Sequence, residues 1–294
     1  MDSVKPELSG STRVYGLIGD PVDHSLSPAI QNAAFRATGL NAVYLPFPVR
    51  EAELRGAVQG LKCLDVKGFN VTTPHKMTVL RYLDEVETEA AEIGSINTVK
   101  NDDGTLTGFN TDGAGALNAM EAAGIRPDEV SVLLIGAGGA GRVIAYTLAA
   151  RGCSLKIANR TVWAARRLTK SLYEKFGLKM NIVPLSRSAL RDSVSEADVI
   201  LNASSMGMDG KHNPPIEKRW IRGDKWVFDI VYRPVRTKLL RDALSAGART
   251  VTGLDMLVSQ GACSFTIWTG KKAPIGEMRR AITKKLISED ASSR

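Results

Sequence analysis

The chain has 294 residues, of which 44% are hydrophobic, and 39 basic against 31 acidic residues give it a formal net charge of +8. This length is too great for one small domain and fits two domains that each bury a sizeable core. No apolar run approaches the roughly 20 residues of a membrane span, and the first ten residues, MDSVKPELSG, lack the apolar core of a signal peptide. We therefore expect a cytoplasmic protein.

Charge and cysteine usage exclude further classes of protein. The positive balance suits an anionic small-molecule substrate and cofactor, whereas no basic run is interleaved with aromatic residues as on a nucleic-acid-binding surface. The odd set of cysteines without C-x-x-C spacing indicates neither disulfides nor a zinc site: Cys63, Cys153 and Cys263. The histidines show no metal-ligand spacing, so we expect no metal: His24, His75 and His212. We expect no nucleic-acid or membrane partner, and a homodimer stays an open alternative.

Strand and helix patterns alternate in the first third of the chain, which predicts an α/β block. Strands are expected at 13–19, 43–49, 66–71, 96–100 and 105–109, and helices at 27–38, 51–61, 77–82 and 84–93. Two prolines in 43–49 indicate a strand near a sheet edge. The turn at 101–104 joins the last two strands as a hairpin. Ser27 suits the N-cap of its helix and Pro28 its first turn.

A second α/β block begins with a helix over 113–123. Val132–Ile135 is wholly apolar, as in a strand buried on both faces of a parallel sheet. Further strands are expected at 154–158, 181–184, 198–202, 225–230 and 249–252, with helices at 142–150, up to 176, 188–195 and 236–245. The last two helices, 255–268 and 276–288, exceed what a six-stranded nucleotide domain needs. We expect them to return and cover the first block.

Glycines stand between the apolar strand and the next helix, at Gly136, Gly138, Gly139 and Gly141. Glycines at this spacing let backbone N–H groups approach a pyrophosphate, and the helix N-terminus adds a partial positive charge. The alternative is a turn that only packs a helix onto a sheet. An NAD site typically has an acid at the end of the next strand, but this chain has Asn159-Arg160-Thr161. Arg160 can pair with a 2′-phosphate, which favours NADP; the alternative is a solvated charge.

The motifs together resemble the shikimate dehydrogenase family, in the correct order and over nearly the whole chain. They are His24-Ser25-Leu26-Ser27-Pro28, the stretch Asn70 to Lys76, Ile96-Asn97-Thr98, the stretch Gly108 to Gly113, the glycine loop, Asn159-Arg160-Thr161, Tyr232-Arg233-Pro234 with Thr237, and the stretch Gly253 to Ala262. The resemblance implies two α/β domains with a cleft between them. These are an N-terminal substrate domain formed by 1–111 with 254–294, and a Rossmann-type NADP-binding domain at 112–253.

The resemblance also implies an enzyme that reversibly reduces 3-dehydroshikimate to shikimate with NADPH, a step of aromatic amino-acid and chorismate biosynthesis. By motif position, the catalytic pair would be Lys76 and Asp112. The implied substrate ligands are Ser25 and Ser27 for the carboxylate, Thr72, Asn97 and Gln260 for the ring hydroxyls, and Tyr232 nearby. The implied cofactor ligands are Gly136, Ala137, Gly138, Gly139, Ala140, Asn159, Arg160, Thr161, Met206, Gly253 and Met256.

The chemistry of the pair agrees with those roles. Hydride transfer to a carbonyl builds negative charge on its oxygen, and a cationic donor such as Lys76 can stabilise that charge and supply the proton. A carboxylate such as Asp112 can hold the ammonium group in place. Taken alone, Lys76 is better explained as a surface lysine that opens a helix, and Asp112 as a helix N-cap; together, within the matched motifs, they favour the catalytic role. Met206 suits packing as well as a nucleotide site, and His75 is interpreted as positional.

Two positions depart from the family pattern. Gln31 stands where many members have histidine and where quinate/shikimate relatives can carry glutamine, which raises the chance of quinate use. Ala164 stands where many NADP-specific members have a second arginine, so the NADP prediction depends on Arg160 and Thr161. The alternatives are a quinate/shikimate dehydrogenase with relaxed specificity and a non-catalytic NADP-sensing regulator; intact Lys76 and Asp112 argue against the regulator.

Overall fold

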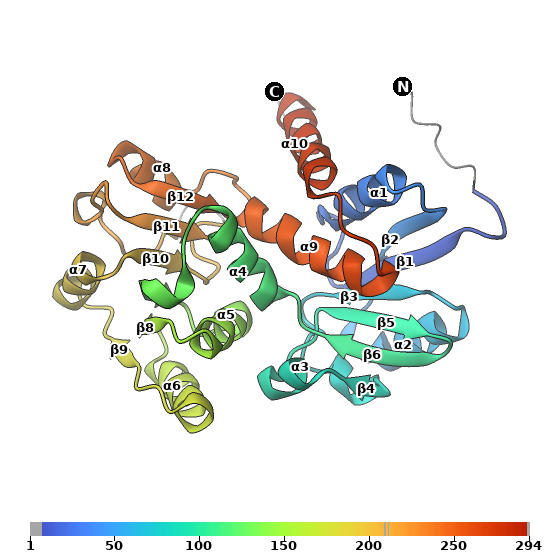
Figure 1. Ribbon diagram of the computed structural model, residues 1–294, viewed down its shortest axis with the longest axis horizontal. Helices are drawn as coiled ribbons and strands as arrows, with labels where there is room; N and C mark the ends of the chain where they lie inside the picture. Colours follow the sequence, from blue (N-terminus) through green and yellow to red (C-terminus); the bar gives the residue numbers. More distant parts are fainter. Residues whose placement is uncertain (1–7, 209, 211, 293–294) are drawn as a thin grey trace. The chain divides into compact units, whose positions relative to one another are not determined.

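The computed structural model describes residues 8–208, 210 and 212–292 and divides the chain into two compact units. The first runs to Thr111 and resumes at Val258, and the second is Asp112–Leu257. Each unit contains a six-stranded sheet flanked by helices (Figure 1), which confirms the predicted α/β class. The sequence placed the second boundary at Gly253, whereas the structure keeps the first turn of the helix from Gly253 in the second unit. Met256, in that turn, packs into the core of the second unit.

The sheet of the first unit is mixed, in the order β2-β1-β3-β5-β6-β4. Its strands are β1 (Arg13–Gly19), β2 (Ala42–Pro48), β3 (Gly68–Val71), β4 (Glu85–Val86), β5 (Thr98–Asp102) and β6 (Thr105–Phe109). Strands β1, β2 and β3 are parallel, while β5 pairs antiparallel with both β3 and β6. The proline-containing β2 is an edge strand, as predicted, and the turn between β5 and β6 has positive φ at Asp103 and Gly104.

The helix expected over 84–93 is wrong in its first half. Residues Glu85–Val86 form the short strand β4, which pairs in parallel with β6. The Asp84 carboxylate fixes this entry because it accepts a 2.8 Å hydrogen bond from the Leu106 N–H. The helix α3 (Thr88–Ile93) begins only where the Glu87 side chain accepts from the Ala90 N–H. The Glu87 side chain, which caps α3, therefore lies at the boundary between strand β4 and helix α3.

Two layers of helices cover this first sheet. Helices α2 (Leu54–Cys63) and α3 bury one face, together with the 3₁₀ turns η1 (Glu51–Glu53) and η2 (Val79–Tyr82). The other face is covered by α1 (Ser27–Ala37), α10 (Ile275–Ser292) and the part of α9 (Gly253–Thr269) that belongs to the first unit. There the Tyr15 ring lies 5.0 Å from Phe35 and 5.3 Å from Trp268. The returning C-terminal helices thus cover the first block as expected, and Met278 and Ile282 are buried.

The second unit has an all-parallel sheet in the order β12-β11-β10-β7-β8-β9. This is the strand order of the dinucleotide-binding fold. The strands are β7 (Ser131–Ile135), β8 (Ser154–Ala158), β9 (Asn181–Val183), β10 (Val199–Asn202), β11 (Trp226–Asp229) and β12 (Arg249–Thr252). The short 3₁₀ turns η3 (Pro127–Glu129) and η4 (Lys218–Trp220) lead into β7 and β11.

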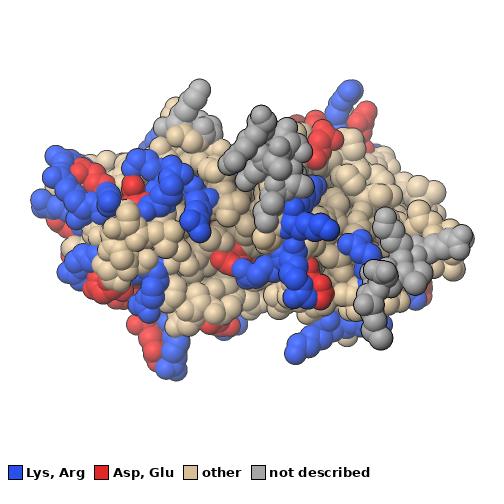
Figure 2. Space-filling model, turned by 90° about the horizontal axis from the view of Figure 1, so that it is seen from above, with Lys and Arg blue, Asp and Glu red and all other residues tan. Residues whose placement is uncertain are grey.

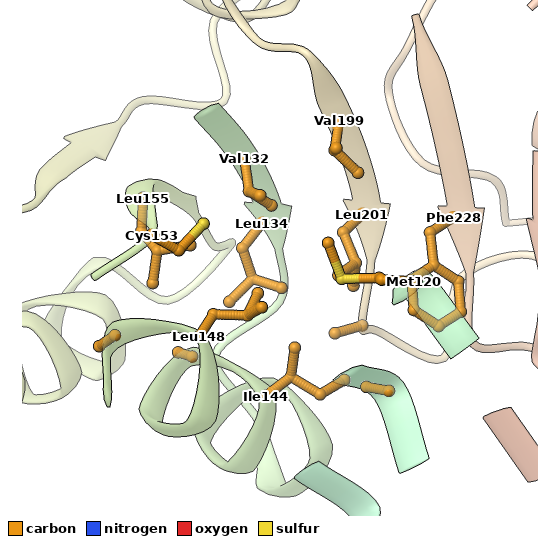
Figure 3. Close-up of a cluster of buried hydrophobic side chains, with 14 of the residues drawn as sticks. Met120, Val132, Leu134, Ile144, Leu148, Cys153, Leu155, Val199, Leu201 and Phe228 are labelled. Carbon is orange, nitrogen blue, oxygen red and sulfur yellow. The ribbon is translucent and has the colours of Figure 1, made fainter. Parts of the chain in front are cut away.

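Both faces of this second sheet are buried, which explains the unbroken apolar sequence of β7. Val132 and Leu134 face α4 (Asp112–Ala122), α5 (Gly139–Ala150) and α6 (Val162–Phe176), with Phe228 in the same cluster (Figure 3). Leu133 and Ile135 face α7 (Arg187–Glu196) and α8 (Lys238–Ser245). Each such side chain stabilises the fold by about 1.5–3 kcal/mol relative to an exposed one.

The surface charges are dispersed. Figure 2 shows lysine and arginine side chains in several groups on one face, with acidic side chains among them. Two exposed ion pairs are Arg187–Glu217 at 2.6 Å and Arg222–Asp224 at 2.8 Å. Exposed pairs stabilise a fold by only about 0–1 kcal/mol each, so the apolar cores dominate stability. Within the described residues, no helix is long and apolar enough to cross a membrane.

A buried acid lies at the carboxyl end of β11 in the second unit. Asp229 is fully buried and accepts hydrogen bonds from the Asn202 Nδ2 at 2.9 Å, the Val231 N–H at 3.1 Å and the Thr237 hydroxyl at 2.6 Å. Burial raises the pKa of Asp229, and these three donors oppose the rise. The carboxylate therefore joins β10, β11 and the start of α8 at the edge of the sheet where α/β proteins bind ligands.

This pKa shift predicts a pH dependence of stability. Between the unfolded-state value of about 4 and the raised folded value, the folded protein binds the Asp229 proton more tightly than the unfolded chain does. The contribution of Asp229 to stability therefore falls as pH rises through that window. In Asp229→Asn this fall is absent, so the stability of the variant relative to wild type should rise as the pH is raised above about 4. Urea unfolding of both proteins at several pH values measures this, and a pH-independent difference would contradict it.

Candidate functional site

The loop after β3 carries Lys76 and is anchored on both sides. The His75 ring is 1% exposed, and its Nε2 lies 2.6 Å from the Val49 carbonyl oxygen. The Lys76 carbonyl accepts a 2.8 Å hydrogen bond from the Ile96 N–H. The His75 ring is thus anchored to the backbone at Val49, and the half-buried Lys76 is joined through its backbone to the segment that leads to Asn97.

Asn97 is the centre of a buried polar group. Its Oδ1 accepts from the Thr111 N–H at 2.7 Å and from the Thr98 hydroxyl at 3.0 Å. Its Nδ2 donates to the Thr111 Oγ1 at 2.9 Å and to the Gln260 Oε1 at 3.4 Å. A backbone N–H can only donate, so the Thr111 contact fixes which end of the Asn97 amide points toward Gln260. Asn97 and Gln260, predicted as ligands of one substrate, are therefore neighbours despite their distance in sequence.

The loop before α1 holds the two predicted carboxylate ligands. The Ser27 N–H donates to the Ser25 Oγ at 3.2 Å, and both residues are half-buried. The predicted N-cap role of Ser27 is wrong, because Leu26 is the N-cap and no side chain caps α1. The reason is that Ser27 already has helical geometry in the first turn. Its hydroxyl is therefore not used to cap the helix.

Thr72 completes the predicted set in the first unit, and Gln31 is the position that departs from the family pattern. Thr72 follows β3 directly and lies against β1: a Cβ on Gly19 would come within 2.3 Å of the Thr72 methyl carbon. Gln31 is 1% exposed, and its Nε2 donates to the Gly261 carbonyl at 2.9 Å. The Gln31 Oε1 has no hydrogen-bond partner among the described residues. Gln31 therefore joins α1 to α9 next to Gln260.

Asp112 is the first residue of α4 and opens the second unit. It is 8% exposed and follows Thr111 directly, so its backbone continues from the residue that orients Asn97. At the next position, a Cβ on Gly113 would lie 2.0 Å from the Thr147 Oγ1. Helix α4 therefore packs closely against α5, the helix that follows the glycine loop.

The glycines of this loop fall into two physical classes. Gly136 has φ of +113°, and a Cβ on Gly141 would lie 2.2 Å from the Gly136 carbonyl oxygen. These two are required by the tight turn and by the packing of α5 on β7. At Gly138 and Gly139, by contrast, a Cβ would meet no protein atom within 4 Å. Packing does not explain them, whereas close approach of a phosphate group does, so the loop fits a dinucleotide.

Arginines gather near the end of β8. The Asn159 Oδ1 accepts from the Ala137 N–H at 3.1 Å and so ties this strand end to the glycine loop. Arg160 is exposed. Burial lowers the pKa of Arg142 in α5, and the positive charge of Arg167 in α6 lowers it further. Helices α5 and α6 both begin at this edge of the sheet, so their N-terminal partial positive charges and the arginines make the edge favourable for an anion.

The remaining predicted cofactor residues also have structural roles. Met256 is 7% exposed and lies in the core cluster that contains Val132 and Leu134. Met206 is partly buried against the cluster on the other face of the sheet, which contains Leu133 and Ile135. The Met206 carbonyl accepts from the Asn202 Nδ2 at 3.0 Å. A Cβ on Gly253 would lie 2.4 Å from the Ile230 carbonyl oxygen. Tyr232 is half-buried in the loop after β11. Ala140 lies in the first turn of α5, and Thr161 is the exposed N-cap of α6.

Several buried polar residues were not predicted from the sequence to have a role. They are Tyr44, Asn70, Thr98 and Ser264, which are all buried and hydrogen-bonded to one another or to Asn97, and Asp229 in the second unit. The available signal was a polar residue inside an otherwise apolar strand, as with Asn70 in GFNV and Asp229 in WVFD. Within the described ranges, no cluster of three or more metal-ligating side chains occurs.

Sequence profiles of known families match most of the chain. The shikimate dehydrogenase substrate binding domain matches residues 17–99. Shikimate / quinate 5-dehydrogenase matches residues 119–223, and the shikimate 5′-dehydrogenase C-terminal domain matches 253–283. The chain is also 44% identical over 283 residues to shikimate dehydrogenase (NADP(+)) of Moorella thermoacetica, covering 95% of this chain and 96% of that protein.

Solved structures agree with these matches. A shikimate dehydrogenase in complex with NADP+ has a TM-score of 0.87 at 39% identity, covering 95% of this chain and 97% of the other. The shikimate 5-dehydrogenase of Listeria monocytogenes, in complex with shikimate and NAD, has a TM-score of 0.89 at 34% identity and covers 95% and 99%.

The two classes of glycine predict opposite outcomes for the same substitution. In Gly141→Ala the new methyl group collides with the Gly136 carbonyl, so the second unit should lose roughly 1–3 kcal/mol of stability, the usual range for overpacking. In Gly139→Ala the methyl group meets no protein atom, so stability should hold while dinucleotide affinity falls. Thermal unfolding and NADP titration of both variants test this. Equal loss of stability in the two variants would contradict it.

Proposed function

The chain belongs to the shikimate dehydrogenase family, and we propose that it catalyses the NADP-dependent, reversible reduction of 3-dehydroshikimate to shikimate, a step of aromatic amino-acid and chorismate biosynthesis. The observation that carries the proposal in detail is the hydrogen-bonded group of the buried Asn97 and Thr111 with the half-buried Gln260. This group presents fixed amide groups next to the anchored loop of Lys76. Such a group suits a small, polyhydroxylated ring.

In the proposed site the first unit binds the substrate. Ser25 and Ser27 donate to the carboxylate through hydroxyls two residues apart at the start of α1. Thr72, Asn97 and Gln260 bind the ring hydroxyls, and Tyr232 of the second unit lies near the substrate. Oδ1 of Asn97 is already occupied by protein donors. The Asn97 Nδ2 is therefore the end that donates to a ring hydroxyl, in place of its long 3.4 Å contact with the Gln260 Oε1, while Gln260 can both donate and accept.

Lys76 carries the proton in the proposed reaction. Its Nζ donates to the oxygen at C3 of the substrate during reduction and takes the proton back during oxidation. Asp112 orients the ammonium group and accepts a hydrogen bond from a neighbouring ring hydroxyl. Bound NADPH supplies the hydride, and NADP+ accepts it in reverse. The proposed cofactor ligands are the loop Gly136–Ala140, Asn159, Arg160, Thr161, Met206, Gly253 and Met256; the open positions at Gly138 and Gly139 fit its pyrophosphate.

Steady-state oxidation of shikimate and quinate, each with NADP and NAD, tests the proposed function. Shikimate with NADP should give a much higher kcat/KM than any other pair. Gln31 is the observation that favours the second candidate, a quinate/shikimate dehydrogenase, because this buried amide lies beside Gln260. Comparable turnover of quinate would establish that alternative, and no turnover of either compound would favour the NADP-sensing regulator.

We also propose a cytoplasmic location. The three cysteines support it, since Cys63, Cys153 and Cys263 form no disulfide in the structure. A homodimer stays a prediction, which sedimentation of the purified protein checks.

Removing the proposed proton donor should abolish most of the activity. We expect Lys76→Ala to lower kcat by roughly two to four decades, the usual range for general acid–base catalysis. NADP affinity should stay unchanged, because the cofactor ligands lie in the other unit. Lys100→Ala is the matched control, since Lys100 forms a partly exposed ion pair with Asp102. The Lys76→Ala, Asp112→Ala double variant should be little worse than the worse single one. A near-normal kcat in Lys76→Ala would assign the proton to water or another side chain.

Arg160→Ala should erode the preference for NADP over NAD. A charged hydrogen bond to phosphate contributes roughly 1.5–3 kcal/mol, or about one to two decades of affinity. Since Ala164 replaces a second arginine, we expect wild type to show a moderate preference. Lys170→Ala removes a charge from α6 at an exposed ion pair and serves as the control. The measurement is kcat/KM with each cofactor, and unchanged discrimination in Arg160→Ala would refute the assignment.

A further inference from the structure

Ser264 is a fully buried hydroxyl at the meeting point of three segments of the first unit. It lies in α9, one helical turn after Gln260, and its Oγ donates to the Gln260 carbonyl at 3.1 Å. The same oxygen lies 2.8 Å from the Thr98 Oγ1 and 3.2 Å from the Thr111 Oγ1. It also accepts from the Asn70 Nδ2 at 3.1 Å. One hydroxyl therefore lies within hydrogen-bond distance of groups on α9, β3, β5 and Thr111.

The direction of the hydrogen bond between Asn70 and Ser264 is fixed by groups that have only one role. The backbone carbonyl oxygen of Asn97 can only accept a hydrogen bond, and it lies 2.9 Å from the Asn70 Nδ2. The amide of Asn70 is thereby oriented, and its Oδ1 faces the Tyr44 hydroxyl at 2.8 Å. Burial raises the pKa of Tyr44 well above its usual value, so this hydroxyl stays a proton donor. Asn70 therefore donates to Ser264 and does not accept from it.

Hydrogen bonds through Thr98 and Thr111 connect Ser264 to the proposed substrate ligands. Thr98 donates to the Asn97 Oδ1, and Thr111 shares hydrogen bonds with both Asn97 and Ser264. The Gln260 side chain is reached through Thr111, since the Thr111 Oγ1 that contacts Ser264 also lies 3.5 Å from the Gln260 Oε1. Removing the Ser264 hydroxyl leaves the Asn70 and Thr98 groups with fewer partners in a buried place, where unpaired polar groups are costly. The neighbouring amides would then rearrange.

We propose that Ser264 is a positioning residue for the substrate: it holds the amides of Gln260 and Asn97 in the orientation that binds the ring hydroxyls. This inference rests on the proposed function. Its effect should appear in substrate affinity, since both amides bind ground state and transition state alike. A hydroxyl that only stabilises the fold would lower the melting temperature and leave KM unchanged.

The test is steady-state kinetics of Ser264→Ala with shikimate and NADP. Loss of one well-placed hydrogen bond corresponds to about a tenfold rise in KM for shikimate, with kcat within about twofold and KM for NADP unchanged. Thr266→Ala is the matched control on the same helix. The exposed Thr266 hydroxyl also donates to the carbonyl four residues earlier, Ala262, at 3.0 Å. Its removal should change neither KM.

A second pair of variants covers the case in which Ser264→Ala does not fold. Thr98→Val removes the hydroxyl that links Ser264 to Asn97 and keeps the side-chain shape, whereas Thr98→Ser keeps the hydroxyl. We expect KM for shikimate to rise in Thr98→Val and to stay near wild type in Thr98→Ser. Equal KM values in these two variants would overturn the proposal.

A double-variant cycle with Gln260→Ala separates positioning from general damage. If Ser264 acts through Gln260, Ser264→Ala should raise KM much less in the Gln260→Ala background than in wild type. Full additivity, or an unchanged KM in Ser264→Ala beside an active wild type, would overturn the role of Ser264 alone. A wild-type protein that does not oxidise shikimate would overturn the proposed function as well, so the two failures are distinguishable.

Discussion

The 2.7 Å hydrogen bond from the Thr111 N–H to the Asn97 Oδ1 is the contact on which the proposed substrate site of the first unit depends. It is buried, and its donor has no second role, so it sets the Asn97 amide in one orientation. Gln260, Thr98 and Ser264 then bond in ways consistent with that orientation. The same peptide segment continues into Asp112. The residue whose N–H orients a proposed substrate ligand is therefore the one that directly precedes the proposed catalytic carboxylate in the chain.

The second unit depends on a different constraint, which is steric. Gly136 and Gly141 allow β7, the turn and α5 to approach more closely than any side chain would permit. The two glycines between them are unhindered, so the loop combines a rigid frame with an accessible backbone. Asn159 and Asp229 then tie neighbouring strand ends to this edge. A parallel sheet with both faces buried leaves such an edge as the natural place for a ligand.

Much of this arrangement could be predicted from local sequence. The strand, glycine turn and helix at 132–150 follow from residue spacing, because each feature depends on neighbours within a few positions. The role of Ser264 could not be predicted, since it contacts Asn70, which is 194 positions away. The Ser27 cap and the helix over 84–93 were wrong for a related reason. At 84–93 local propensity favoured a helix, but the contact between Asp84 and Leu106 places a strand first. At Ser27 it favoured an N-cap, but α1 begins one residue earlier, with Leu26 as the N-cap.

The most direct test of the account is a crystal structure of the protein with bound shikimate and NADP+. The account predicts that the carboxylate lies within hydrogen-bond distance of the Ser25 and Ser27 hydroxyls, and that the ring hydroxyls face Asn97 and Gln260. It also predicts that the Thr111 N–H remains on the Asn97 Oδ1. A carboxylate bound at the Asn97 and Gln260 end, or a Thr111 N–H separated from Asn97, would contradict it.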